Sequence, residues 1–242
     1  MKIIVTNDDG IDAEGINILF DVLSSAHEVY MIAPDRQRSA CSNAITIHDT
    51  VKLRRKDSRR YSLSGFPADC TNFGLCSGLF PKPDIVISGI NHGTNMGDDV
   101  FYSGTVAGAR AGYIHFHNAI AVSYESFTDS GYMRDASEFI MTFAEEKTKG
   151  ETERFFFNIN YPSKSSSEVK GLKYTFLGKR KYVDRYELVG KGSDVEEYQL
   201  EGIVDSLHKE GSDVTELREG YISVTPLHLD TTDYSYIEKA VL

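Results

Sequence analysis

The sequence predicts an α/β fold in which a mostly parallel sheet is flanked by helices. Two observations lead to this prediction. Short apolar runs alternate with amphipathic stretches over about the first two-thirds of the 242 residues, and the pattern changes after Pro162. Alternating strands and helices are typical of a parallel sheet built from right-handed crossovers.

Five strands and four helices account for the alternating part of the chain. The first helix is indicated by Ile16, Leu19, Phe20 and Leu23, which share one helical face. The other elements follow from similar patterns. We expect strands at 2–6, 28–33, 84–88, 119–123 and 154–160, and helices at about 13–25, 67–79, 104–115 and 134–147.

The segment 44–64 departs from this alternation. Residues 45–48 and 51–54 alternate in period two, and Lys56-Asp57-Ser58 can form a turn before Tyr61. This pattern predicts β-hairpins. The segment also carries a basic cluster, for which a solvated hairpin tip is favoured over a phosphate-binding patch. Its members are Lys52, Arg54, Arg55, Lys56, Arg59 and Arg60.

The chain divides at Pro162 into an expected α/β core, residues 1–162, and a C-terminal extension, residues 163–242. Residues 163–200 are rich in Lys, Ser, Glu and Tyr and contain short alternating runs such as 173–177. They indicate a β-containing extension with an oligomerisation hairpin that projects and pairs with another subunit. A strand at 221–227, within the run Gly220–Leu227, is expected to return to the core.

Composition limits the classes of partner. The chain has 36 acidic and 26 basic residues and a formal net charge of −10. A nucleic acid polymer is therefore an unexpected partner, whereas a small phosphorylated substrate is not excluded, because a bound metal can supply positive charge. The early polar residues and the lack of a long apolar run predict neither a leader nor a membrane span. Three cysteines without metal-finger spacing indicate reduced thiols and a cytoplasmic protein.

Two adjacent carboxylates, Asp8 and Asp9, follow the first predicted strand in the run Asn7-Asp8-Asp9-Gly10. Ligands of open α/β sheets lie at the carboxyl ends of the strands. Two like charges side by side there are unfavourable unless a cation neutralises them, so a divalent metal is the favoured explanation. The alternative is that both residues only cap the following helix and form a turn.

The loop after the second strand should emerge at the same edge of the sheet. Ser39, Ser42 and Asn43 offer neutral oxygen and amide groups there, and Arg36 and Arg38 offer charge for a phosphate. An ordinary polar turn explains the same residues equally well.

Two further candidate segments lie on either side of residue 100. Asn91, in the Gly- and Asn-rich run 89–99, offers an amide oxygen just beyond a strand, whereas the lone His92 is read as incidental. The run 102–109 begins a small-residue helix whose free N–H groups, with the hydroxyls of Ser103 and Thr105, can form an anion site. The alternative is a capped helix whose Gly and Ala only permit close packing. No G-x-G-x-x-G follows the first strand, and no P-loop motif occurs.

Taken together and in this order, the motifs resemble the SurE family of 5′/3′-nucleotidases over nearly the whole chain. The matching segments are Val5–Ile11, Ala33-Pro34 with Ser39 and Ser42, Gly65–Cys70, Ser88–Gly97, Asp99–Val106 and Gly220–Leu227.

The resemblance implies a Rossmann-like domain with a C-terminal extension exchanged between subunits, giving a homodimer or a dimer of dimers. It implies one divalent metal per subunit, bound by Asp8, Asp9, Ser39 and Asn91. This all-oxygen set suits Mg²⁺ or Mn²⁺ better than Zn²⁺. Asn95, Ser103 and Thr105 are implied near the phosphate, with Asp8 among the catalytic residues.

The expected activity is metal-dependent hydrolysis of nucleoside 5′- and 3′-monophosphates, with polyphosphate a further candidate substrate. Asp8 could act as a metal ligand, a general base or a nucleophile. Two other functions remain as alternatives: a metal-dependent deacetylase, which would need histidine ligands near the paired carboxylates, and a nucleotide-binding regulator without turnover.

Three positions depart from the family pattern. Ala40 stands where the family usually has Gly, and we expect Ala to be tolerated only if φ is negative there. Ala111, next to Arg110, stands where a Glu is frequent. Tyr234, near Asp230, stands where some relatives have His. These departures bear on substrate preference and subunit contacts.

Overall fold

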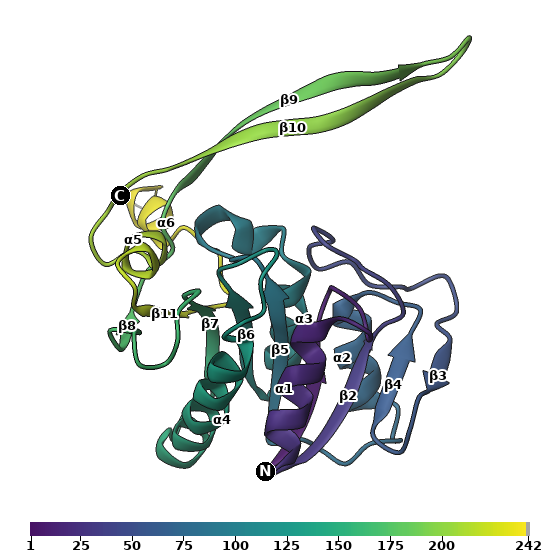
Figure 1. The fold of residues 1–242 in the computed structure, drawn as a ribbon, viewed down its shortest axis with the longest axis vertical. Helices are drawn as coiled ribbons and strands as arrows, with labels where there is room; N and C mark the ends of the chain where they lie inside the picture. The colour runs from purple at the N-terminus through teal and green to yellow at the C-terminus, as the bar shows by residue number, and fades with distance from the viewer. Residues whose placement is uncertain (241–242) are drawn as a thin grey trace.

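The computed structural model describes residues 1–240 and contains the expected alternation of strands and helices (Figure 1). The elements in chain order are β1 (Lys2–Thr6), α1 (Glu14–Ser24), β2 (Glu28–Pro34), β3 (Leu53–Arg55), β4 (Arg60–Leu63), α2 (Pro67–Cys76), β5 (Ile85–His92), the 3₁₀ helix η1 (Gly97–Phe101), α3 (Gly104–Ile114), β6 (Asn118–Tyr124), α4 (Met133–Gly150), β7 (Phe156–Tyr161), β8 (Leu172–Tyr174), β9 (Arg180–Lys191), β10 (Glu196–Ser206), α5 (Asp213–Arg218), β11 (Ile222–Pro226) and α6 (Tyr234–Ala240).

Nine strands form the main sheet, in the order β3-β4-β2-β1-β5-β6-β7-β11-β8. Strand β1 lies between β2 and β5 and is parallel to both, and β5, β6 and β7 continue the parallel part. Strand β3 is antiparallel to β4, and β11 is antiparallel to β7. The predicted α/β fold with a mostly parallel sheet flanked by helices is confirmed.

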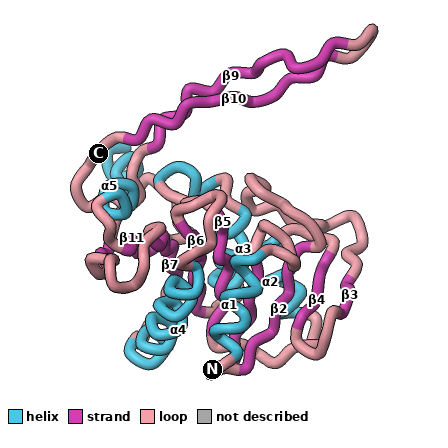
Figure 2. Tube along the Cα trace, viewed as in Figure 1, coloured by secondary structure: helices cyan, strands magenta, loops and turns pink. Residues whose placement is uncertain are grey.

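Helices cover both faces of the sheet because apolar side chains of the central strands alternate between them. In β1, Ile3 and Val5 belong to the core cluster that includes Leu19 of α1, whereas Ile4 belongs to the cluster that includes Cys70 of α2. Helices α1 and α4 pack on one face, and α2 and α3 pack on the other (Figures 1 and 2). The carboxyl ends of β1, β2 and β5 therefore share one edge of the sheet.

The strand predicted at 45–48 is wrong. This segment is irregular, and Ile45 and Ile47 are exposed. The backbone N–H of Thr46 donates to Asp69 Oδ1 at 2.9 Å, and its hydroxyl donates to Asp69 Oδ2 at 2.7 Å. A side chain of α2 thus takes the place of a neighbouring strand as hydrogen-bond acceptor. Further along, the hairpin of β3 and β4 does form.

Strand β5 is longer than the sequence indicates. It was expected to end at Ser88, but it continues to His92, with a shift of register against β6 between Ser88 and Asn91. Gly89 lies within this irregularity, at a φ of +140°, and a Cβ there would lie 2.3 Å from the carbonyl oxygen of Val122. The irregular strand therefore explains the glycine that suggested a loop.

The segment after Pro162 contains both a projecting hairpin and strands of the main sheet. Strands β9 and β10 pair with each other and extend away from the rest of the fold (Figure 1). Strand β8 coincides with the start of the alternating run at 173–177, and β11 confirms the strand expected within 220–227. Helices α5 and α6 were not expected. The domain division at 162 stays a prediction. Among the described residues, no helix combines the length and apolarity needed to cross a membrane.

Ala40 adopts a backbone conformation that contradicts the expectation from the sequence. Its φ is +55°, in the left-handed region, and Ser42 two residues later has a φ of +51°. A residue with a Cβ is disfavoured there relative to Gly. The condition set for Ala40, a negative φ, is therefore not met, because the loop after β2 turns back over β1 and residue type alone does not reveal this path.

Replacing Ala40 with Gly should therefore stabilise the protein. We expect Ala40→Gly to raise the free energy of unfolding by about 0.5–1 kcal/mol, since relief of the left-handed conformation exceeds the entropy cost of Gly. Urea denaturation measures the change. Ala44→Gly is the control, because Ala44 lies in the same loop at negative φ and should be destabilised. Equal effects of the two substitutions would contradict the argument.

Candidate active site

Asp8 and Asp9 lie in a short loop directly after β1. The Asn7 side chain holds this loop, since its Nδ2 donates to the Gly10 carbonyl at 2.9 Å and its Oδ1 accepts from the Gly10 N–H at 3.2 Å. Gly10 has a φ of +101°, and a Cβ there would lie 3.1 Å from the backbone of Arg36. Helix α1 begins after Ala13 without a side-chain cap. The two carboxylates therefore do not cap α1, although they do lie in the turn that Asn7 closes with Gly10.

Burial makes the ionised form of Asp8 unfavourable. The side chain is 4% exposed, and its pKa is raised from 3.8 to about 6, first by burial and then by the charge of Asp9, although hydrogen bonds from Thr105 oppose the rise. Burial also raises the pKa of Asp9, against the effect of the His92 N–H. Two neighbouring carboxylates are thus held where each would be stabilised by a cation.

Helix α3 lies unusually close to the sheet because glycines line its inner face. A Cβ at Gly104 would lie 2.8 Å from both Asp8 Cβ and Cys41 Sγ. At Gly108 it would lie 2.7 Å from Ser88 Oγ, and at Gly112 it would lie 2.8 Å from Val86. These glycines recur every four residues, so they share one face. The first turn of α3 is therefore in contact with Asp8.

Ser103 and Thr105 are buried at the start of α3 and have separate hydrogen-bonding roles. Ser103 is the N-cap, and its Oγ accepts from the Val106 N–H at 3.0 Å. The Thr105 hydroxyl donates to Asp8 Oδ1. The capped-helix reading thus holds for Ser103, while Thr105 fixes the carboxylate of Asp8. The other N–H groups of the first turn have no acceptor within α3, and helix starts of this kind bind anions.

The loop after β2 closes over this edge of the sheet. The N–H of Arg38 donates to the Asp8 carbonyl at 2.6 Å, and the N–H of Ser42 donates to the Tyr102 carbonyl at 2.9 Å. Ser39, which directly follows Arg38, is exposed, and its hydroxyl accepts from Gln37 Nε2 at 3.0 Å. The structure therefore brings Ser39 to the edge of the sheet that carries Asp8.

Asn91 lies at the end of β5, beside Asp9. Its Nδ2 donates to the carbonyls of His92 and Gly93 at 3.1 and 2.7 Å, so the amide nitrogen is committed to the backbone. The His92 N–H donates to Asp9 Oδ2 at 3.4 Å. This contact joins the end of β5 to the paired carboxylates, and the amide oxygen of Asn91 is the side-chain group left for a cation.

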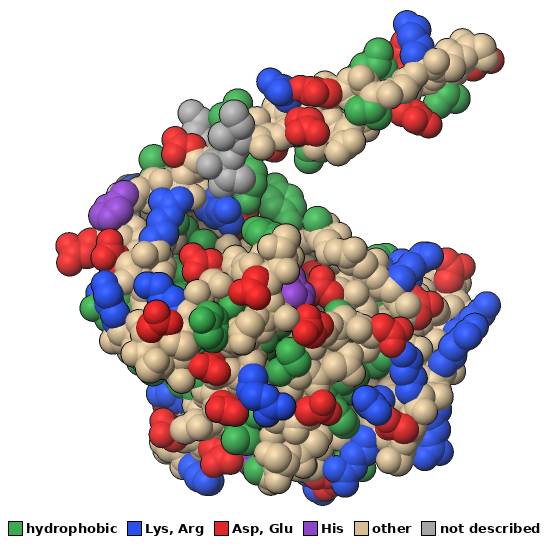
Figure 3. Space-filling model, viewed as in Figure 1, with side chains coloured by type: hydrophobic (Ala, Val, Ile, Leu, Met, Phe, Trp, Pro, Cys, Tyr) green, Lys and Arg blue, Asp and Glu red, His purple; other side chains and the backbone are tan. Residues whose placement is uncertain are grey.

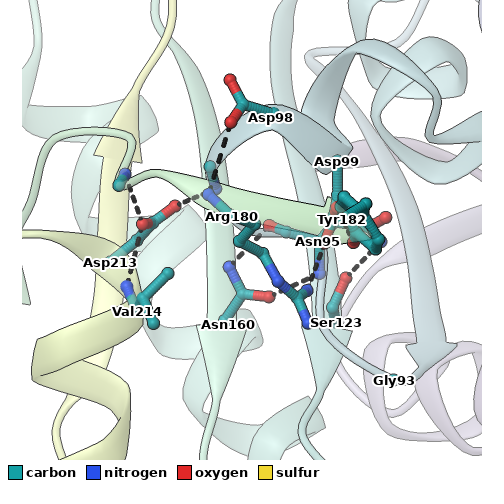
Figure 4. A network of polar contacts seen from close by, with 12 residues as sticks. Gly93, Asn95, Asp98, Asp99, Ser123, Asn160, Arg180, Tyr182, Asp213 and Val214 are labelled. Atoms are coloured by element: carbon teal, nitrogen blue, oxygen red, sulfur yellow. Dashed lines mark hydrogen bonds and ion pairs between the residues drawn. The ribbon is translucent and has the colours of Figure 1, made fainter. Parts of the chain in front are cut away.

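Asn95 is embedded in a buried polar network instead of lying at the start of α3 (Figure 4). Its backbone N–H donates to Asn160 Oδ1 at 2.9 Å, and its Nδ2 donates to Ser123 Oγ at 2.8 Å. Its carbonyl accepts from Asn158 Nδ2 at 2.8 Å. One N–H of the Asn95 side-chain amide is therefore already used. These contacts hold the segment that leads from β5 into η1.

The base of the hairpin is tied to the same segment, which the sequence did not indicate. The buried carboxylate of Asp213 accepts from the N–H of Gly97 at 2.8 Å and from the N–H of Gly178 at 2.7 Å (Figure 4). Asp99 pairs with Arg180 and accepts a hydrogen bond from the Tyr182 hydroxyl. Because η1 leads directly into Ser103, these contacts connect the hairpin to the start of α3.

One signal for this network is present in the sequence. Asn158 and Asn160 alternate within a strand that is otherwise apolar, and both are fully buried. Buried amides of this kind need partners, so they mark a polar network beneath the sheet edge. Asp99 pairs with Arg180, and Asp213 accepts from Gly97, each about 80 or more residues away in the sequence. No local sequence pattern identifies partners at such separations.

Ala111 and Tyr234, which depart from the family pattern, have no recorded hydrogen bond to Asp8 among the described residues. Ala111 is buried in α3, while the neighbouring Arg110 donates to Asn43 Oδ1 at 2.9 Å. The Tyr234 hydroxyl donates to Asp230 in an exposed part of the chain.

Within residues 1–240, no three side chains of His, Cys, Asp and Glu come together as a metal cluster. The set predicted from the sequence is of another kind, with two carboxylates, a hydroxyl and an amide oxygen. Such hard oxygen donors match the chemistry of Mg²⁺ and Mn²⁺.

Comparison with known proteins assigns the chain to a family. Residues 3–184 match the family model described as survival protein SurE. The 5′-nucleotidase SurE of Leptospira interrogans serogroup Icterohaemorrhagiae serovar copenhageni is 43% identical over 99% of this chain and 96% of its own length. That of Geotalea uraniireducens is 39% identical over 97% of this chain and 96% of its own.

A solved structure agrees with the sequence comparison. The crystal structure of the SurE protein from Aquifex aeolicus superposes with a TM-score of 0.85 at 33% identity, and the alignment covers 99% of this chain and 98% of that one. The match includes the segments that carry the paired carboxylates and the start of α3. The chain therefore belongs to the SurE family.

Proposed function

We propose that this protein is a divalent-metal-dependent phosphomonoesterase that hydrolyses nucleoside 5′- and 3′-monophosphates to nucleoside and phosphate. Relatives that cover nearly the whole chain carry the name 5′-nucleotidase SurE. The extension to 3′-monophosphates rests on the family resemblance, and polyphosphate is a further candidate substrate.

The observation that carries this proposal is the contact between Asp8 and the first turn of α3. A carboxylate can bind a cation, and a helix N-terminus can bind an anion. Because Asp8 contacts the first turn of α3, these two kinds of site lie next to each other. A phosphate bridging the two would be held by N–H groups at the helix start and by the cation at the carboxylates. This arrangement suits phosphoryl transfer, which depends mainly on positioning and charge.

The proposed metal ligands are Asp8, Asp9, Ser39 and Asn91, holding one Mg²⁺ or Mn²⁺ per subunit. A bound divalent cation would polarise the phosphoryl oxygen and offset the charge of the carboxylates. The buried, unfavourably charged pair Asp8 and Asp9 fits such an ion, as does the unused amide oxygen of Asn91.

The remaining proposed roles follow from the hydrogen bonds at the site. Thr105 holds Asp8 Oδ1 and fixes the direction of its carboxylate, whether Asp8 serves as ligand, base or nucleophile. Ser103 caps α3 and so fixes the helix start, whose N–H groups we assign to the phosphate. Asn95 donates to Ser123, and we therefore assign it to positioning the segment before η1. Its direct contact with phosphate stays a prediction.

Phosphate release from a panel of 5′- and 3′-nucleoside monophosphates tests the proposal directly. We expect release with Mg²⁺ or Mn²⁺ and its loss in EDTA, because the paired carboxylates need the cation. Released phosphate is measured by colorimetry. Folded protein that binds the nucleotides without releasing phosphate with either metal would instead support a nucleotide-binding regulator.

Asp8→Asn should abolish turnover while stabilising the metal-free protein. The folded-state pKa of Asp8 is about 6 against an ordinary 3.8, so ionisation favours the unfolded chain. This cost is absent at a pH below both values, grows between them and is complete above about pH 6. In EDTA at pH 7.5 we expect the free energy of unfolding to rise by about 2–3 kcal/mol.

The control for this variant is Asp21→Asn, on the exposed face of α1. It should leave both turnover and stability unchanged. Thermal unfolding of each variant at pH 5 and pH 7.5 separates the effects, because the gain for Asp8→Asn should shrink at the lower pH. Full activity of Asp8→Asn would remove the paired-carboxylate argument.

We further propose a cytoplasmic location and a homodimer or dimer of dimers in which the hairpin is exchanged between subunits. Cys41, Cys70 and Cys76 are free thiols among the described residues, which is typical of a reducing compartment. The hairpin presents exposed apolar side chains on one face, since Tyr186 pairs with Leu200 and Leu188 pairs with Tyr198. An isolated ribbon with such a face gains stability from a partner.

Charges placed on this apolar face should dissociate the oligomer. We expect Tyr186→Glu with Leu200→Glu to shift the mass measured by light scattering towards that of the monomer, because burying unpaired carboxylates is unfavourable. The control is Glu187→Ala with Gln199→Ala, a cross-strand pair on the opposite face. An unchanged mass for the Glu variant, or the same dissociation by the control, would contradict exchange through this face.

A further inference from the structure

A cleft of about 400 Å³ lies between the loop after β2 and the hairpin of β3 and β4. Its lining includes four basic residues, Arg36, Arg38, Lys52 and Arg54, one carboxylate, Asp35, and three residues with hydroxyl groups. None of these residues is a proposed metal ligand, and none is among Asn95, Ser103 and Thr105, although Arg36 and Arg38 are the residues that offered charge for a phosphate. The cleft is therefore a separate, mainly cationic site on a chain whose net charge is −10.

The alternation of β3 explains why part of the basic cluster faces the cleft. Leu53 packs against an apolar core cluster, so Lys52 and Arg54 on either side of it point the opposite way. Other members of the cluster are engaged elsewhere, since Lys56 pairs with Asp12 and Arg60 pairs with Asp57. Lys52 and Arg54 are exposed, as the solvated-tip interpretation expects, and both also line the cleft.

One of the four cations is held in place by neighbouring groups. Arg38 Nη2 donates to the Ser64 carbonyl at 2.9 Å and lies 3.6 Å from Asp35 Oδ1, and its guanidinium stacks over Phe66. Asp35 therefore balances Arg38. Within the described residues, Arg36, Lys52 and Arg54 have no carboxylate partner in an ion pair. Lys and Arg side chains gather over β3 and β4 in the space-filling view (Figure 3).

The cleft and the paired carboxylates share one short loop. The Arg38 N–H donates to the Asp8 carbonyl, and the Arg36 backbone packs against Gly10. The Arg38 side chain lines the cleft while its backbone contacts Asp8, so the cleft adjoins the loop that carries the paired carboxylates. Guanidinium and ammonium groups with nearby hydroxyls favour a phosphate dianion at that position.

We infer that this cleft binds a second phosphate on the substrate, so that nucleoside 3′,5′-bisphosphates are bound in preference to monophosphates. The inference rests on the proposed function for the reaction itself, because the first phosphate is the one hydrolysed. Its binding component depends only on Arg36, Lys52 and Arg54 and can be measured without turnover.

The test compares calorimetric binding of adenosine 3′,5′-bisphosphate and AMP to the full chain in EDTA. Wild-type protein should bind the bisphosphate more tightly than AMP. Lys52→Ala with Arg54→Ala should weaken bisphosphate binding about tenfold, a change of about 1.4 kcal/mol, and AMP binding less than twofold. The control is Arg55→Ala with Arg59→Ala, which removes the same charge from the same hairpin outside the cleft and should leave both affinities unchanged.

Three outcomes would overturn the inference: equal wild-type affinity for the two nucleotides, equal weakening of both by the Lys52 and Arg54 substitutions, or the same loss in the control. The same loss in the control would mean that the positive charge of the hairpin attracts the nucleotide without a specific contact in the cleft. Absence of bisphosphate binding would overturn it as well. Metal-dependent phosphate release from AMP, measured in parallel, reports on the proposed function alone, so the two failures are distinguishable.

Discussion

The arrangement of the whole sheet edge depends on keeping the Asp8 carboxylate buried. Water would solvate the charge of Asp8, yet the side chain is 4% exposed and lies under the first turn of α3. Its neighbours compensate only in part, through the Thr105 hydroxyl and the helix N-terminus. The rest of the site follows from this constraint, because the loop around Asn7, the start of α3 and the loop at Arg38 all bear directly on one residue.

Such an arrangement lowers folding stability, because it keeps a negative charge at a buried position. A buried acid with a raised pKa is unfavourable for the folded chain, and unfavourable groups of this kind gather at functional sites. The loop after β2 shows the same tendency in its backbone, since Ala40 and Ser42 both adopt left-handed conformations there. Charge and backbone strain thus coincide on the two loops that meet at the sheet edge.

Local patterns in the sequence were sufficient for the parts of the fold that depend on periodicity. The apolar run before Asp8 and the helical face of Ile16 and Leu19 predict β1 and α1 closely, and the order of strands and helices implies the parallel sheet. The paired carboxylates could be placed at the correct edge because parallel strands share their carboxyl ends.

What could not be predicted depends on contacts between distant segments. Residues 45–48 have the pattern of a strand, but Asp69 accepts the hydrogen bonds of Thr46 in place of a neighbouring strand. Asn95 was expected near the phosphate, and nothing local in the sequence indicated its contacts with Ser123 and Asn160 in a buried network. The hairpin was expected, but its attachment through Asp213 was not. In each case the deciding partner is remote in sequence, so periodicity carries no information about it.

The glycine face of α3 has a consequence for engineering new specificities into this scaffold. Gly104, Gly108 and Gly112 leave no room for a methyl group, so this side of the helix is closed to variation. Mutant libraries that include these positions would consist largely of chains in which α3 has shifted away from the sheet. Variation is better placed at the half-buried Arg110, which reaches Asn43, because changes there leave the glycine face and its contact with Asp8 in place.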